Sequence, residues 1–133
     1  MRLTTLSEYG LLALIYLSRQ DTGKSIPLSE IAKAQKLPVK YMEHIMQTLC
    51  RAGLLLSARG KMGGYRLRRS ADKITVAEVV RLFDGPLAPT ESVSKFFYRS
   101  TPIEKEKKLV SLMRDVRDYT ARKLESVTIT ELR

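Results

Sequence analysis

The sequence has little of the chemistry that most catalytic and metal sites need. Its 133 residues include one cysteine and one histidine, so no intramolecular disulfide can form and few soft metal ligands are present. A single histidine also leaves few options for acid-base catalysis, and no nucleophile, base and orienting acid fall together along the chain. These scarcities argue against an enzyme.

Long hydrophobic runs are also missing. The N-terminal segment MRLTTLSEYGLLALIYLSRQ has a short apolar run between charged residues and no small-residue cleavage site, unlike a signal peptide. Nothing in the sequence approaches the roughly 18 apolar residues that a membrane span requires. We therefore expect a cytoplasmic protein without a membrane partner.

Acidic side chains are outnumbered by basic ones. The chain has 24 lysines and arginines against 14 acidic residues, a net charge of +10. A surplus of this size is typical of proteins with a polyanionic partner such as nucleic acid. Residues 1–85 contain 14 basic and 7 acidic side chains, whereas residues 86–133 contain 10 and 7. The charge pattern predicts that the partner meets the N-terminal part.

Helical periodicity dominates the first half of the chain. Apolar residues recur at helical spacing over 5–18, and a polar loop, RQDTGKS, follows. A short helix is expected over 27–37, with Pro27 in its first turn, and a longer one over 39–53, closed by Gly53. Two helices joined by a tight turn predict a helix-turn-helix.

Glycines are concentrated directly after these helices. The strand-like runs LLLSAR and YRLRR flank GKMGG, as in a β-hairpin. A hairpin after a helix-turn-helix is a wing, and its glycines let the chain reverse while basic residues approach a partner. Met62 stands where a phosphate-binding P-loop has serine or threonine, so nucleotide hydrolysis is not expected.

Two capping boxes mark helices in the C-terminal half. Thr75 and Glu78 precede a helix that ends at Gly85, and TPIE, with Thr101 as the cap, precedes a long last helix. The apolar stripe of that last helix repeats at steps of three and four, which favours packing on a second copy of the chain. The stripe comprises Leu109, Met113, Val116, Thr120, Leu124 and Val127.

The order of these motifs resembles the Rrf-type (Rrf-two) family of bacterial winged helix-turn-helix transcription regulators. The resemblance rests on MRLTTLSEYGLLAL, LSEIAKAQKLPVKYMEHIMQTLCRAGLL, SARGKMGGYRL and ITVAEVVRLFDGPLAP, and on the closing RDVRDYTARKLESVTITEL. It implies a mainly α fold with a small β-hairpin wing, with a DNA-binding domain over 1–85, a linker over 86–100, and a dimerisation helix and tail over 101–133. It also implies a homodimer, most often a repressor, on an inverted-repeat operator of double-stranded DNA.

Eight residues are the candidates for contact with DNA: Lys40, Tyr41, Glu43, His44, Arg59, Lys61, Arg66 and Arg68. The first four fall where the family's recognition helix meets the major groove, and Arg59 falls where the wing enters the minor groove, whose electronegative form suits arginine. The last three would hold phosphates together with Arg69. Strand alternation puts Arg69 on the face opposite Arg66 and Arg68, so not all three can reach DNA. The alternative for these three arginines is that they belong to a solvated strand face without contacting DNA. The alternative for His44 is a polar surface position without base contact.

The chain departs from the family pattern at two kinds of position. Pro38 stands at the recognition-helix cap, where family members often have serine, and His44 stands where glutamine is common, so the operator sequence is left open. The three cysteines that hold an iron–sulfur cluster in some members correspond here to Ser92, Tyr98 and Glu104. Such a cluster needs several thiolate or imidazole ligands. We therefore expect no cofactor, as in the cluster-free branch that includes the cysteine-metabolism repressor.

Several alternatives stay open. Cys50 is either a redox switch on the DNA-facing helix or a packed helix residue. Phe96, Phe97 and Tyr98 either line a pocket for an unknown effector or partner, or fill space beside the long helix. The chain as a whole is either a DNA-binding regulator, a winged-helix protein-interaction module, or a regulator that holds a cluster through unusual ligands.

Overall fold

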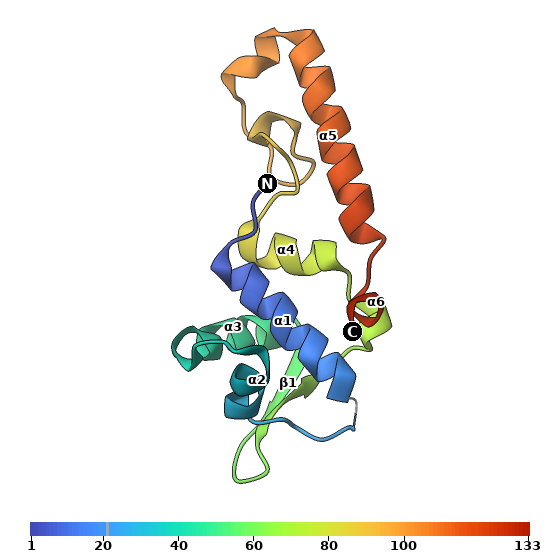
Figure 1. The fold of residues 1–133 in the computed structure, drawn as a ribbon. Helices are drawn as coiled ribbons and strands as arrows, with labels where there is room; N and C mark the ends of the chain where they lie inside the picture. Colours follow the sequence, from blue (N-terminus) through green and yellow to red (C-terminus); the bar gives the residue numbers. More distant parts are fainter. Residues whose placement is uncertain (21) are drawn as a thin grey trace.

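The computed structural model describes residues 1–20 and 22–133 and is mainly α-helical with one small hairpin. Its helices are α1 (Thr5–Gln20), α2 (Leu28–Gln35), α3 (Val39–Arg51), α4 (Val76–Asp84), α5 (Lys107–Glu125) and α6 (Ile129–Leu132). Its strands are β1 (Leu55–Ala58) and β2 (Gly64–Leu67), and its 3-10 turns are η1 (Ala71–Lys73), η2 (Glu91–Val93) and η3 (Pro102–Lys105). This architecture, shown in Figure 1, confirms the predicted fold class. Position 21 of the predicted loop after α1 lies outside the described residues.

The core joins α1, α2, α3, α4 and the hairpin around one set of apolar side chains. Its fully buried members are Ala13, Leu14, Ile31, Met42, Ile45, Met46, Leu49, Leu54, Ile74, Val79 and Ile129. On α3 the four buried residues follow the i, i+3, i+4, i+7 pattern, because a helix with 3.6 residues per turn places these positions on one face. Helix α1 crosses α4 closely at Gly10, where an added Cβ would lie 2.7 Å from Phe83 Cε2.

The beginning of α1 is held by the end of α4. Asp84 accepts hydrogen bonds from the Thr4 backbone N–H, at 3.1 Å, and from the hydroxyl groups of Thr4 and Ser7. The capping of α1 therefore comes from an acidic side chain 80 positions away, which complements the positive end of the helix dipole. A partner so far away along the chain leaves no local signal in the sequence.

The chain before α5 leads away from the core, and α5 runs back toward it, so that its end lies beside α4 and α6 (Figure 1). The Val76 N–H donates to the Val127 carbonyl at 2.9 Å, and the Ile129 N–H donates to the Ile74 carbonyl at 2.9 Å. The side chain of Ile129 is fully buried in the main core. The last residues thus complete the hydrophobic core of the N-terminal half.

The predicted capping box at TPIE is wrong. Pro102–Lys105 is a 3-10 turn, and the long helix begins only at Lys107. The Thr101 hydroxyl donates to Ser92 Oγ at 2.6 Å instead of capping the helix. The Glu104 carboxylate likewise accepts hydrogen bonds from Tyr98 and Ser100 instead of reaching back to Thr101. Contacts with the preceding loop therefore replace the local cap.

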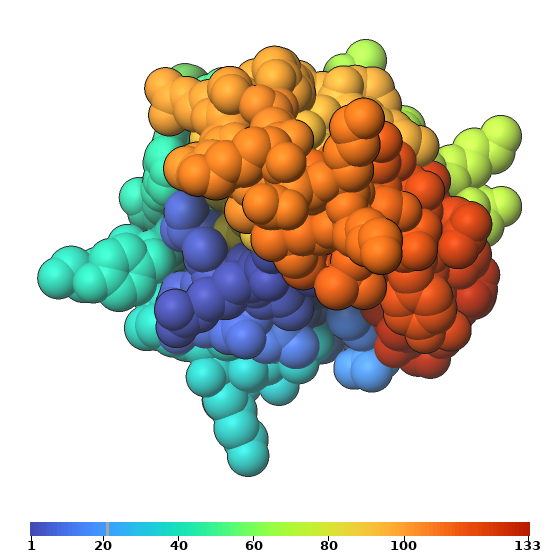
Figure 2. Space-filling view, turned by 90° about the horizontal axis from the view of Figure 1, so that it is seen from above, coloured from blue at the N-terminus to red at the C-terminus, as the bar shows by residue number. Residues whose placement is uncertain are grey.

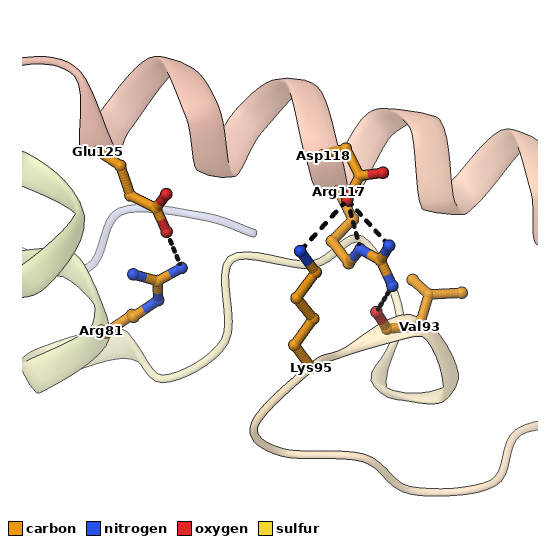
Figure 3. Close-up of polar contacts among 6 residues, drawn as sticks. All are labelled: Arg81, Val93, Lys95, Arg117, Asp118 and Glu125. Carbon is orange, nitrogen blue, oxygen red and sulfur yellow. Dashed lines mark hydrogen bonds and ion pairs between the residues drawn. The ribbon is translucent and has the colours of Figure 1, made fainter.

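The predicted linker, residues 86–100, is tied to α5 by charged side chains (Figure 3). Arg117 donates to the Val93 carbonyl at 2.8 Å and to Asp118 Oδ1 at 2.9 Å, and Lys95 Nζ lies 3.9 Å from the same carboxylate oxygen. Further along α5, Glu125 pairs with Arg81 of α4 at 2.7 Å. These contacts fix the orientation of α5 relative to the linker and to α4.

No helix among the described residues is long and apolar enough to span a bilayer.

Candidate nucleic-acid interface

A tight turn sets α3 relative to α2. Lys36 adopts a left-handed conformation with φ of 55°, and the Leu37 N–H donates to the Ala32 carbonyl at 2.8 Å. Pro38 follows as the N-cap of α3 and makes no side-chain capping hydrogen bond. Because proline disfavours helical backbone in the residue before it, α2 cannot run on into α3. The result is the predicted helix-turn-helix.

Helix α3 has one apolar face and one polar face. Met42, Ile45, Met46 and Leu49 are fully buried in the core. The four candidate DNA-reading residues on this helix are all exposed: Lys40, Tyr41, Glu43 and His44. The Lys40 ammonium lies 5.6 Å from the centre of the Tyr41 ring, a cation–π contact that keeps the two side chains together. The polar face of α3 is therefore free to meet a partner.

The wing, formed by β1, β2 and the turn between them, is an antiparallel hairpin with Leu55 opposite Leu67 and Ala58 opposite Gly64. Gly64 must be glycine, because an added Cβ would lie 2.1 Å from the Ile26 carbonyl oxygen. Gly60 turns the hairpin with φ of 90°. Both predicted strands are confirmed, each one or two residues shorter than the strand-like runs LLLSAR and YRLRR.

A groove of about 590 Å³ separates α3 from the wing, and we call it the α3–wing groove. Glu43 lines it from α3, and Arg59 lines it from the wing turn. Gln47 and Arg51 also line it, although neither is among the residues predicted to contact DNA. Their signal was present, since positions 43, 47 and 51 are spaced four apart and so lie on one helix face. The groove joins acidic, amide and guanidinium groups, which are the groups that bind base edges and phosphates.

The remaining basic candidates lie outside this groove. Lys61 is exposed in the wing turn. Arg66 lines a small cavity with Gln20 and Lys24, and Arg68 lines a separate cavity with Arg133. The exposed Arg66 and Arg68 share one face of β2 and its continuation.

Arg69 lies on the other face, as strand alternation predicts. It pairs with Glu78 at 2.5 Å. Its positive charge is therefore paired within the chain with Glu78.

Cys50 lies on α3 beside the α3–wing groove and is half-buried. Burial raises the pKa of its thiol, because the low-polarity surroundings disfavour the thiolate. A raised pKa reduces the thiolate fraction that oxidation needs. The environment of Cys50 therefore favours the packing interpretation over the redox interpretation.

The structure divides the predicted dimerisation stripe of α5 between two faces. Leu124 packs within the chain, against the cluster of Val76, Ala77, Val80 and Leu87, and so does Val127, which lies beyond the end of α5 and not on the helix as predicted. Met113 packs beside Val110, and Thr120 is half-buried. Leu109 and Val116 are exposed, and so are two residues that the sequence analysis missed, Leu112 and Tyr119. Leu109, Leu112, Val116 and Tyr119 form what we call the exposed α5 stripe.

The fold and the α3–wing groove define a winged helix-turn-helix, the DNA-binding architecture of many transcription regulators. Comparison with known proteins agrees. Residues 3–133 match the Rrf2 family, described as iron-dependent transcriptional regulators. The chain belongs to this family, so it is a transcription regulator and no enzymatic family is indicated.

Similar proteins support this assignment over nearly the whole chain. The chain is 31% identical to the transcriptional regulator CymR of Bacillus subtilis over 132 residues, which cover 99% of this chain and 89% of CymR. It is 35% identical to a putative rrf2-like regulator of Rhodobacter capsulatus over 100 residues, 73% of this chain and 67% of that protein. The solved structure of B. subtilis CymR, the global cysteine regulator, has a TM-score of 0.79 at 30% identity and covers 99% of this chain and 95% of that chain. The structure of T. potens IscR has a TM-score of 0.75 at 26% identity, with 99% and 85% covered.

The iron in the family description requires ligands that this chain does not supply at the corresponding place. Ser92, Tyr98 and Glu104 come together in one cavity, but they offer a hydroxyl, a phenol and a carboxylate. In the part of the chain that the structure describes, no group of three or more His, Cys, Asp and Glu side chains is placed to hold a metal. Cys50 lies in the α3–wing groove instead. These residues do not fit an iron–sulfur cluster.

Proposed function

We propose that the protein is a homodimeric, sequence-specific regulator that binds an inverted-repeat operator in double-stranded DNA, acts as a repressor in the cytoplasm, and uses no iron–sulfur cluster. The observation that carries the proposal is the α3–wing groove. It places Glu43 and Gln47 of α3 opposite Arg59 of the wing, with the exposed side of the recognition helix beside them.

The two walls of the groove suit different parts of DNA. Glu43 can accept a hydrogen bond from a cytosine amino group, and Gln47 can bind an adenine edge in the major groove. Arg59, next to the glycine turn, can enter a narrow minor groove, where the negative potential is strongest. Lys40, Tyr41 and the exposed Lys61 would hold flanking phosphates. This division of roles requires α3 and the wing to engage adjacent grooves together.

Dimerisation would use the exposed α5 stripe. Leu112 and Tyr119 are 54% and 67% exposed, large values for apolar and aromatic side chains. Their spacing with Leu109 and Val116, in steps of three and four, is that of a helix-packing seam. Figure 2 shows the start of α5 and the N-terminal residues on one face of the molecule, where a second copy has access. A two-fold axis there would present two α3 helices to an inverted repeat.

Repression follows most directly from such binding, because a dimer on an operator blocks access to the same DNA. Glu43 and Gln47 each favour particular bases, but their side chains alone do not give the order of bases in the operator. The operator sequence must therefore be found by experiment. Selection of bound genomic fragments by the purified protein, followed by sequencing, identifies it. We expect an inverted repeat with half-sites about one helical turn apart.

The central test compares two arginine variants on that selected operator. Arg59→Ala should weaken binding by about 1–3 kcal/mol and relax the preference at the minor-groove position. Arg122→Ala removes the same charge from an exposed position on α5 and should leave affinity unchanged. Undiminished affinity in Arg59→Ala would remove the central claim. Failure to select any DNA, or binding without salt dependence, would favour a protein-interaction module instead.

A further inference from the structure

Another cavity, of about 530 Å³, lies between the predicted linker and the start of α5, on elements separate from those that line the α3–wing groove. We call it the linker–α5 cavity. It is lined by Ser92, Tyr98, Glu104, Lys107, Val110 and Arg114. The DNA-binding roles proposed above use none of these residues. The cavity combines one carboxylate, two cations, two hydroxyl groups and an apolar floor.

Glu104 is a fixed negative charge at one side of the cavity. Its Oε1 accepts a hydrogen bond from the Tyr98 hydroxyl at 2.5 Å, and its Oε2 accepts one from the Ser100 hydroxyl at 2.6 Å. The bonds from Ser100 and Tyr98 lower the pKa of Glu104, because both donate to its ionised form. A carboxylate has about four acceptor sites, so Glu104 can still accept hydrogen bonds from a ligand.

Lys107 and Arg114 supply positive charge on the α5 wall. They are seven residues apart, which places both on one face of the helix, with their Cα atoms about 10 Å apart. Among the described residues neither takes part in an ion pair. By contrast, Arg117 on the same helix already binds Asp118 and the Val93 carbonyl (Figure 3). The two cations are therefore available to a negatively charged group.

The linker wall of the cavity is held in place without a ligand. Ser92 is buried, and its oxygen accepts a hydrogen bond from the Thr101 hydroxyl at 2.6 Å. Val110 is buried against Ala88 and Val93 and forms the floor. The bond from Arg117 to the Val93 carbonyl ties this wall to α5. A site whose walls are already ordered loses less entropy when a ligand binds.

We propose that the linker–α5 cavity binds a small amino acid-type metabolite, with its ammonium group beside Glu104 and its carboxylate on Arg114 and Lys107. A simple anion would be repelled by the ionised Glu104, and a simple cation by the two basic side chains. A molecule that carries both charges satisfies both sides of the cavity. Arginine suits the carboxylate because its guanidinium can bind both oxygens at once.

Such a ligand would join the linker to the part of α5 that bears the exposed α5 stripe. Lys107 and Arg114 flank Leu109 and Leu112 along the same helix. Binding would therefore change the freedom of the helix through which two copies are proposed to pair, and so their operator affinity. This effector role rests on the proposed function, whereas ligand binding itself does not.

The experiment is isothermal titration of the full chain, without DNA, with each of the twenty standard amino acids. Succinate and inorganic phosphate serve as anion-only probes. At least one amino acid should bind, and its N-acetyl and carboxamide derivatives should bind roughly tenfold more weakly or worse, because each lacks one charged partner. Glu104→Gln and Arg114→Ala should weaken binding by a similar factor. Lys108→Ala, an exposed lysine next to the cavity but outside its lining, should not.

Three results would overturn the proposal: no amino acid binds at millimolar concentration, binding survives both cavity variants, or succinate binds the unmodified protein as tightly as the best amino acid does. Circular dichroism checks that each variant folds, and Arg114→Lys, which keeps the charge but loses the two-pronged contact, replaces Arg114→Ala if the latter unfolds. Operator binding is then measured with and without the bound amino acid. If an amino acid binds but the protein does not bind DNA, only the proposed function is contradicted. If the amino acid binds but leaves operator affinity unchanged, only the effector role is contradicted.

Discussion

Ile26 and Tyr65 exchange two backbone hydrogen bonds of 2.8 Å, so the wing is fastened to the chain just ahead of α2. This short bridge couples the position of the wing to the helix-turn-helix. Arg59 and Glu43 line one groove from the two units that this bridge holds together.

Gly64 lets this bridge form, and its replacement should break it. Gly64→Ala would push a Cβ to 2.1 Å from the Ile26 carbonyl oxygen. We expect a loss of about 2 kcal/mol or more in the free energy of unfolding, measured by urea titration. Gly60→Ala is the matched control, since its φ is also positive but nothing lies within 4 Å of its added Cβ. It should cost only about 1 kcal/mol. Equal losses would show that contact with Ile26 is not the cause.

Gly10 controls how closely α1 approaches α4. Gly10→Ala would place a Cβ 2.7 Å from the edge of the Phe83 ring. Overpacking of this kind costs about 1–3 kcal/mol, which thermal unfolding would reveal as a lower midpoint. The double variant Gly10→Ala with Phe83→Leu should recover part of the loss, because it removes the clashing ring edge. If the double variant loses more stability than the two single variants lose together, this packing explanation is contradicted.

Asp118 predicts an acid-sensitive contribution to stability. The hydrogen bond from Arg117 lowers its pKa, with further help from the charges of Arg117 and Lys95. A carboxyl group with a lowered folded-state pKa stabilises the fold above its unfolded pKa of about 3.9 and loses that contribution as the pH falls through the folded value. Asp118→Asn should therefore be less stable than the parent protein at pH 7, and the difference should shrink below about pH 4.

Urea midpoints between pH 7 and pH 3 provide the measurement for Asp118. Asp115→Asn serves as the control, because Asp115 is exposed on the same helix and forms no ion pair among the described residues. A stability difference for Asp118→Asn that is constant across this range would mean that its ionisation does not stabilise the fold.

The Cys50 thiol should be a poor nucleophile in the folded protein. Burial raises its pKa, so alkylation by iodoacetamide should reach half of its maximal rate at a higher pH in the native protein than in urea. Mass spectrometry of timed samples measures both rates on the same residue. If Cys50 is alkylated faster in the native protein than in urea at neutral pH, the redox interpretation is favoured instead.

The N-terminal elements were predictable because their signals are local. On α3, the spacing predicts one apolar face of Val39, Met42, Ile45, Met46 and Leu49. The last four are fully buried, whereas Val39, in the first turn, is exposed. Pro38 and Gly53 mark the two ends of the same helix within a residue or two. The wing followed from its glycines and its two β-rich runs. In each case the side chains that decide the structure lie within a few positions of one another.

Errors arose where distant contacts override a local pattern. TPIE reads as a helix cap, but the Thr101 hydroxyl binds Ser92, nine positions earlier. The stripe of α5 was assigned to one face, yet Leu124 packs on α4 residues some 45 positions away while Leu112 is left exposed. Periodicity finds the apolar positions of a helix, but it cannot say which neighbour covers them. The linker–α5 cavity was equally beyond a sequence reading, since it depends on how the linker folds.

Ile129 adds a constraint on how this molecule is made. Its side chain fills the core built by α1, α3 and the hairpin, so that core stays incomplete during synthesis until residues beyond α5 have left the ribosome. The helix-turn-helix and wing can thus reach their full stability only in a chain that already carries α5, the helix proposed for pairing. A truncated product that ends at residue 85 would expose the gap left by Ile129 and be an easy substrate for proteolysis.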